Sequence, residues 1–173
     1  MRSVFGVSWW IPPVLLALAA IIQSSFLPAL GLVQVRPDLV LAIVVIWAVL
    51  RGVREALPWA LLGGLLADTI SGGPFGASAF ALVIVAFCSS AGEAGVFRNS
   101  LFLPLVAVFW SNVLYGIIML FLLATFQQQI DWLASLRHIV VPGALATMVV
   151  TPLLYFPLSR LERRTRRIVV VEW

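Results

Sequence analysis

The sequence predicts an all-α integral membrane protein, a bundle of six transmembrane helices with both termini in the cytoplasm. Of its 173 residues, 62% are hydrophobic and only 10% are charged, whereas soluble domains carry roughly 25% charged residues. So few charges cannot cover a water-facing surface, and the mean hydropathy of +1.11 points the same way. The apolar residues form separate runs, and the arginines gather in alternate connections between them.

Six apolar segments divide the chain, and we expect each one to be a transmembrane helix. A span needs about 20 residues to cross about 30 Å of hydrocarbon, and the first, fifth and sixth segments are that long. The second, third and fourth are short. They either extend into the flanking turns, thin the membrane or pair as a re-entrant hairpin, and we favour full spans. The predicted transmembrane domain is 1–159, a basic cytoplasmic tail follows at 160–173, and the spans are about 9–30, 38–50, 56–71, 75–91, 101–124 and 139–159.

The first segment also has features of a cleaved signal peptide. Arg2 precedes the apolar run, and Ala17-Leu18-Ala19 has the small-residue pattern of a cleavage site. Because the run continues through Ala20-Ile21-Ile22 without a polar break, we favour a retained helix over cleavage.

The chain has no lysine, so the arginines alone carry the basic charge that predicts the orientation of the helices. With six spans, Arg36 and Arg137 fall on one side of the membrane and the other nine fall together on the opposite side. Cytoplasmic loops carry such an excess of basic residues. The nine are Arg2, Arg51, Arg54, Arg98, Arg160, Arg163, Arg164, Arg166 and Arg167. A five-helix arrangement would separate the basic tail from the loop at 51–55.

Four tryptophans lie near predicted cytoplasmic helix ends: Trp9, Trp10, Trp47 and Trp59. Tryptophans at such positions are typical of interfacial anchors. Ordinary packing inside the protein is the alternative. A fifth, Trp132, falls in the connection at 125–138, which we expect to be an external loop.

Pro37 and Asp38 open the second segment. The proline disfavours helix in the residue before it, and a carboxylate suits the positive end of a helix dipole. We therefore favour helix capping by Asp38 over ligand binding.

Small residues recur through the third segment at helical spacing of three and four. Such a stripe lets helices approach closely, so we expect a face for helix packing or for a partner. Asp68 follows Gly64 by four residues and shares this face. It is either a polar knot or ligand contact in the bundle, or a helix-end residue that bonds the turn at 71–73. The stripe consists of Ala56, Ala60, Gly63, Gly64 and Ala67.

The turn at 69–76 contains Gly72, Pro74 and Gly76. Glycine permits positive φ, and proline is favoured at the start of the next helix. The glycines could suggest a phosphate-binding loop, but we do not favour one because no GxxxxGK[ST] pattern occurs and no strand precedes the turn.

The fifth and sixth segments carry polar residues within apolar runs. Asn112 shares a face with Ser111 and Tyr115, and Gly143 and Thr147 begin a row of small residues that ends at Thr151. Small and polar residues of this kind join transmembrane helices. A solute site would use the same groups, and we favour packing.

The basic tail is next to the last predicted span. Its arginines are Arg160, Arg163, Arg164, Arg166 and Arg167. Each one contributes about 1 kcal/mol to binding of anionic lipid. An acidic cytoplasmic partner is the alternative, and topology explains these charges better than nucleic-acid binding does.

Nothing in the chain suggests an enzyme, a cofactor or a metal site. It has one histidine, His138, and one cysteine, Cys88, and it contains no HExxH motif. We therefore expect a protein without catalytic residues.

Four short motifs occur in an order and at spacings that resemble the MreD family of rod shape-determining proteins. They are Gln23-Ser-Ser-Phe-Leu-Pro28, Arg36-Pro37-Asp38-Leu39, Gly63-Gly64-Leu65-Leu66-Ala67-Asp68, and Gly72 with Gly76. The resemblance covers about 20–90. It implies structural roles for these motif positions and a multi-pass protein of the bacterial inner membrane.

The resemblance also implies a function and partners. MreD proteins associate with MreC, a single-span protein with a periplasmic β-domain, and work alongside the MreB filament and the peptidoglycan synthase pair of the lateral wall. The expected role is a non-enzymatic scaffold for cell elongation. The family is similar in fold to the substrate-binding subunits of energy-coupling-factor vitamin transporters. A small-molecule-binding transport subunit is therefore the alternative function, and self-association stays open.

Overall fold

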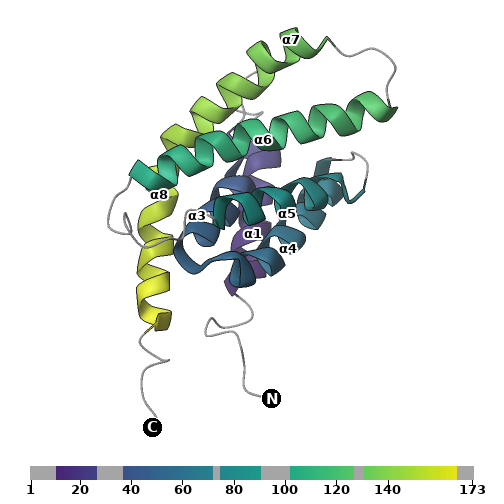
Figure 1. Ribbon diagram of the computed structural model, residues 1–173. Coiled ribbons are helices and arrows are strands. Elements are labelled where there is room, and N and C mark those ends of the chain that lie inside the picture. The colour runs from purple at the N-terminus through teal and green to yellow at the C-terminus, as the bar shows by residue number, and fades with distance from the viewer. Residues whose placement is uncertain (1–10, 27–36, 72–74, 91–101, 127–130, 167–173) are drawn as a thin grey trace.

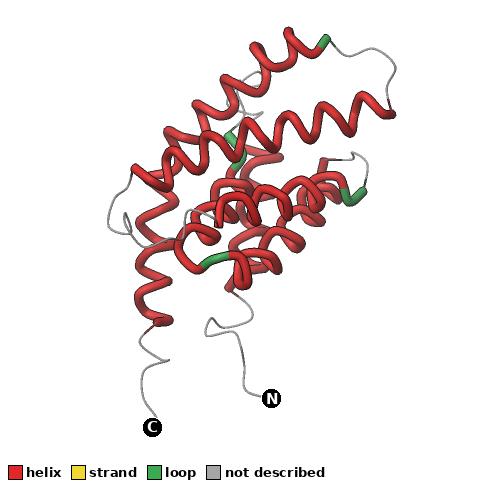
Figure 2. The backbone as a smooth tube through the Cα atoms, viewed as in Figure 1, coloured by secondary structure: helices red, strands yellow, loops and turns green. Residues whose placement is uncertain are grey.

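The computed structural model describes residues 11–26, 37–71, 75–90, 102–126 and 131–166. These ranges consist of helices joined by short turns and contain no strand (Figure 2). The prediction of an all-α fold is confirmed for this part of the chain.

Six helical segments make up the described residues, in the order in which the sequence predicts its six spans. The first is α1 (Ile11–Ile21) with the π-helical turn η1 (Ile22–Phe26). The next four are α3 (Leu39–Arg51), α4 (Val53–Ser71), α5 (Ala77–Ser90) and α6 (Phe102–Phe126). The last comprises α7 (Trp132–Ser135), η3 (Leu136–Val140) and α8 (Val141–Arg166).

Two connections differ from the sequence expectation. Gly52, at φ 83°, is the only residue between α3 and α4, so the expected loop at 51–55 is mostly helix and α4 is longer than predicted. The expected external loop at 125–138 is helical from Trp132 onward. The side chain of Trp132 is exposed.

α3 lies at the centre of the bundle (Figure 1) and contacts α1, α4, α5, α6 and α8. Its residues from Val40 to Ala48 are all buried. A helix surrounded on every side needs apolar residues on every side, which explains the unbroken run VLAIVVIWA.

α6 and α8 pack side by side at the outside of the bundle (Figure 1). The stretches Phe102–Thr125 and Trp132–Glu162 are long and apolar enough to cross a membrane, and only 17% and 28% of their most apolar windows are buried. The core helix of a soluble protein would be mostly buried. Here large apolar side chains point outward, including Trp110, Phe121, Val149 and Leu153.

The last helix bends partway along its length (Figure 1). Pro152 and Pro157 lie inside it, and proline removes a backbone hydrogen bond and kinks a helix. The residues beyond the bend pack against the end of α3, where the backbone carbonyl of Glu162 accepts from Arg51.

Candidate functional site

The start of α3 is held by side chains from three separate elements. Asp38 caps the helix, and its Oδ1 accepts from the backbone N–H of Leu41 at 3.0 Å. The amide oxygen of Gln23, on η1, accepts from the N–H groups of Leu39 at 2.9 Å and Val40 at 3.4 Å. The backbone N–H of Asp38 donates to Thr147 Oγ1 at 2.9 Å. All four N–H groups at this helix start are therefore satisfied within the protein.

Thr147 joins three helices through one buried hydroxyl group. Besides the bond from Asp38, Oγ1 accepts from Asn112 Nδ2 at 3.0 Å and donates to the carbonyl of Gly143 at 2.8 Å. A hydroxyl has one donor and two acceptor positions, so every position is used. The structure thus brings together three residues predicted for packing, Asn112, Gly143 and Thr147, and adds Asp38 to them.

Asp68 is buried at the end of α4 and fixes the start of the next helix. Its Oδ2 accepts from the N–H of Gly76 at 2.8 Å, and its Oδ1 accepts from the N–H of Ser78 at 3.0 Å. Gly76 has φ 92°, a conformation that favours glycine. Ser78 in turn accepts a hydrogen bond from the Tyr115 hydroxyl at 3.1 Å, which ties α5 to α6. Gly72, predicted as part of this turn, lies outside the described residues.

The small-residue stripe of α4 is used inside the chain. Ala56, Ala60, Gly63 and Gly64 are buried, and Ala67 is half-buried. A Cβ atom added at Gly64 would overlap the backbone of Ala79 on α5, and one added at Gly63 would lie 2.9 Å from Val40 Cγ1. The stripe therefore packs against α5 and α3. This leaves no part of the Gly63–Gly64 surface for a partner.

A pocket of about 380 Å³ opens between these two capped helix starts. Small-molecule sites in proteins have volumes of roughly 300–1,000 Å³. Half of the residues around the pocket are polar: Gln23, Ser24, Asp38, Ser71, Ser78 and Tyr115. The other half are apolar: Ala20, Val40, Ala67, Ile70, Leu82 and Met119. We refer to this space as the α3–α5 pocket.

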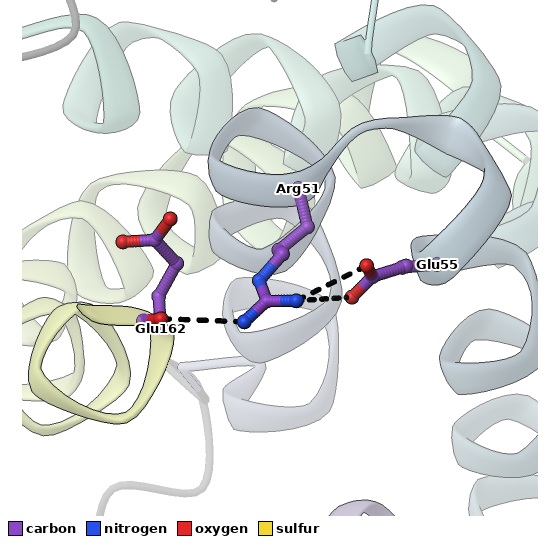
Figure 3. Close-up of polar contacts among 3 residues, drawn as sticks. All are labelled: Arg51, Glu55 and Glu162. Carbon is purple, nitrogen blue, oxygen red and sulfur yellow. Dashed lines mark hydrogen bonds and ion pairs between the residues drawn. The ribbon is translucent and has the colours of Figure 1, made fainter. Parts of the chain in front are cut away.

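The opposite end of the bundle contains Arg51, whose side chain is only 8% exposed and lies between α4 and α8 (Figure 3). Arg51 Nη1 donates to both carboxylate oxygens of Glu55 at 3.1 Å, and Nη2 donates to the backbone carbonyl of Glu162 at 3.2 Å. Its guanidinium lies 5.4 Å from the centre of the Trp47 ring, which stacks on Trp59 at 4.4 Å. We call these five residues the Arg51 clamp, because they join α3, α4 and α8.

The clamp corrects the sequence interpretation of two tryptophans. Trp47 and Trp59 are buried at 0% and 4% exposure, so they pack inside the protein and are not interfacial anchors. Arg51 entered the sequence argument only as a topological charge. The four-residue spacing of Arg51 and Glu55 was the available signal for their pairing.

The basic tail begins within α8. Arg160 is exposed. Arg163, Arg164 and Arg166 belong to the helix, but their side chains lie outside the described residues, as does the whole of Arg167. The described residues contain no group of three or more His, Cys, Asp or Glu side chains that could hold a metal ion.

One comparison with known proteins covers nearly the whole chain. The family model described as rod shape-determining protein MreD matches residues 3–165. This match confirms the resemblance carried by the motifs between 20 and 90 and extends it over the later helices. No curated protein and no solved structure matches the chain.

Proposed function

The chain belongs to the MreD family of rod shape-determining membrane proteins, and we propose that it is a non-enzymatic scaffold of the cell-elongation machinery. In this role it would be a multi-pass protein of the bacterial inner membrane. It would bind an MreC-like single-span protein and help to organise lateral peptidoglycan synthesis. MreB and the wall synthase pair are further proposed partners.

Besides the family, one observation supports this proposal: polar side chains inside the bundle are engaged in holding helices in place. Asp38, Gln23, Thr147, Asn112 and Asp68 bond to helix starts and to one another. Groups used in this way set the positions of helices. A bundle with fixed helix positions presents a constant outer surface, as a scaffold requires.

The proposed membrane setting is supported by the outward-facing apolar side chains of α6 and α8. Phe121 is 65% exposed and Val149 is 79% exposed, and lipid or the single helix of a partner would cover such residues favourably. The exposed Arg160 and the arginines that follow it suit a membrane surface rich in anionic lipid.

Co-purification with the MreC-like protein of the same genome tests the scaffold proposal. The two full-length proteins, expressed together and extracted in mild detergent, should elute as one complex. An unrelated single-span protein of similar length, carrying the same affinity tag, is the control. Separate elution of the two proteins at concentrations where each is stable would contradict the proposal.

The α3–α5 pocket favours one alternative, a small-molecule-binding subunit of a membrane transporter. Under this hypothesis the purified protein should retain a vitamin-like compound that mass spectrometry detects after denaturation. The same preparation serves both tests, because partner binding and ligand retention are measured separately.

A further inference from the structure

The α3–α5 pocket has a chemical character that restricts what it can hold. It is formed by α1, η1, α3, α4, α5 and α6, so its residues come from stretches far apart in the sequence. Gln23 and Ser24 lie on the π-helical turn η1, and π-helical turns are frequent at functional sites. The pocket is large enough for a small organic group.

The pocket does not suit an anion. Helix starts bind anions through unused backbone N–H groups, but Gln23, Asp38 and Thr147 already bond the N–H groups from Asp38 to Leu41. The Asp68 carboxylate likewise occupies the N–H groups of Gly76 and Ser78. No arginine or histidine is among the described residues that line the pocket.

The groups that remain favour a cation with hydrogen-bond donors. The lining includes one carboxylate, Asp38, which is half-buried. A carboxylate inside a membrane-spanning bundle is costly, and a cationic partner offsets that cost. The hydroxyls of Ser24 and Ser71 supply further acceptors at the exposed rim, and Ile70 and Met119 supply apolar surface beside them.

We propose that the α3–α5 pocket binds a primary ammonium group attached to an apolar body, with Asp38 as its counter-ion. The amine comes either from a membrane amphiphile or from a soluble compound, since both present the same group. The ammonium lies against Asp38, and the apolar part contacts Ala67, Ile70 and Met119. This inference is independent of partner binding, so it stands or fails separately from the scaffold role.

Photo-crosslinking of the full-length protein in maltoside detergent tests the proposal. The probe is an alkylamine that carries a diazirine, and mass spectrometry locates the labelled residues. We expect saturable labelling of peptides containing Ile70 or Met119, displaced by excess octylamine and not by octanoate. Displacement by ethanolamine as well as octylamine would identify a soluble amine, and displacement by octylamine alone would identify a membrane amphiphile.

Two variants with matched controls sharpen the test. Asp38→Asn keeps a good capping residue and removes the charge, so octylamine should compete about tenfold less well. The control Asp131→Asn makes the same change at the exposed cap of α7 and should leave competition unchanged. Ala67→Leu fills the pocket and should abolish the saturable labelling, whereas Ala134→Leu, at an exposed position, should not.

Three results would overturn the proposal. They are displacement of the probe by octanoate as well as by octylamine, labelling that does not saturate, and two variants that behave like the unaltered chain. The last means that octylamine competes equally well in Asp38→Asn and that saturable labelling persists in Ala67→Leu. Circular dichroism and elution volume establish that each variant folds. If Asp38→Asn fails to fold, the octylamine and octanoate comparison on the unaltered chain and the Ala67→Leu variant still decide the outcome.

Discussion

The two ends of the bundle are stabilised in different ways. At the start of α3, neutral backbone N–H groups bond to side chains, and a pocket remains between the helices. At the end of α3, the Arg51 guanidinium bonds to α4 and α8 and lies over Trp47, which stacks on Trp59. The comparison shows that the described polar residues serve different purposes at the two ends: at one they position helix starts around a space, and at the other they join helix ends.

Gly64→Leu should reduce stability more than the other variants, because Gly64 lies on α4, the helix that connects the two ends. Helix α4 carries Glu55 of the Arg51 clamp at one end and Asp68 at the other. A side chain at position 64 overlaps the Ala79 backbone, and overpacking of this kind costs about 3 kcal/mol. Denaturant-induced unfolding in detergent measures the loss. Leu65→Ala, at the exposed neighbouring position, should change stability little, and equal stability of the two variants would refute the close α4–α5 approach.

Thr147→Val should weaken the pocket end alone. It leaves the backbone N–H of Asp38 and the amide of Asn112 without their acceptor, and each such buried group costs about 1–3 kcal/mol. Hydrogen exchange should accelerate at residues 38–41 and stay unchanged near Glu162. Thr125→Val is a matched control, because the exposed Thr125 hydroxyl also donates to a carbonyl four residues earlier. Uniformly faster hydrogen exchange along the chain would argue against a local role for Thr147.

Arg51→Met should weaken the opposite end alone. The half-buried Glu55 loses its ion-pair partner, and the hydrogen bond from Arg51 to the carbonyl of Glu162 is lost, at a cost of about 1–2 kcal/mol. Exchange should accelerate in the last part of α8, while the start of α3 stays protected. Arg54→Met, which removes an exposed arginine from the first turn of α4, is the control. Faster exchange at residues 38–41 would show that the two ends are coupled.

Asp38→Asn should have the smallest effect on folding. Asparagine caps helices about as well as aspartate, so the free energy of unfolding should change by less than about 0.5 kcal/mol. The change in charge should appear in amine competition and hardly at all in unfolding. A large destabilisation would mean that the carboxylate itself, and not its capping geometry, holds the start of α3.

The sequence predicted the features that depend on local pattern. The unbroken apolar run of α3, the capping position of Asp38 and the close-packing stripe around Gly64 are each visible within one helix turn or two. Features that depend on distant segments were not predictable. Thr147 bonds to Asp38 across 109 residues of chain, and nothing in either segment specifies the other.

The expectation for Trp47 and Trp59 failed for a physical reason. They were placed by the usual preference of tryptophan for membrane interfaces, but they lie in α3 and α4, which Gly52 folds against each other. Their spatial neighbours across the turn outweighed the preference of the single residue. For Asp68 the sequence left two interpretations open, a polar knot in the bundle or a bond to the turn at 71–73, and the structure places it in the bundle with its oxygens bonded to the start of α5.

The one-residue connection at Gly52 leaves α3 and α4 no slack, so the two helices form a tight hairpin. An epitope inserted beside Gly52 would pull Glu55 away from Arg51 and disturb the trajectory of α8. The same insertion between α7 and α6 would lengthen a connection that already spans several residues. Among the connections that the structure describes, this one therefore leaves the least freedom to add sequence.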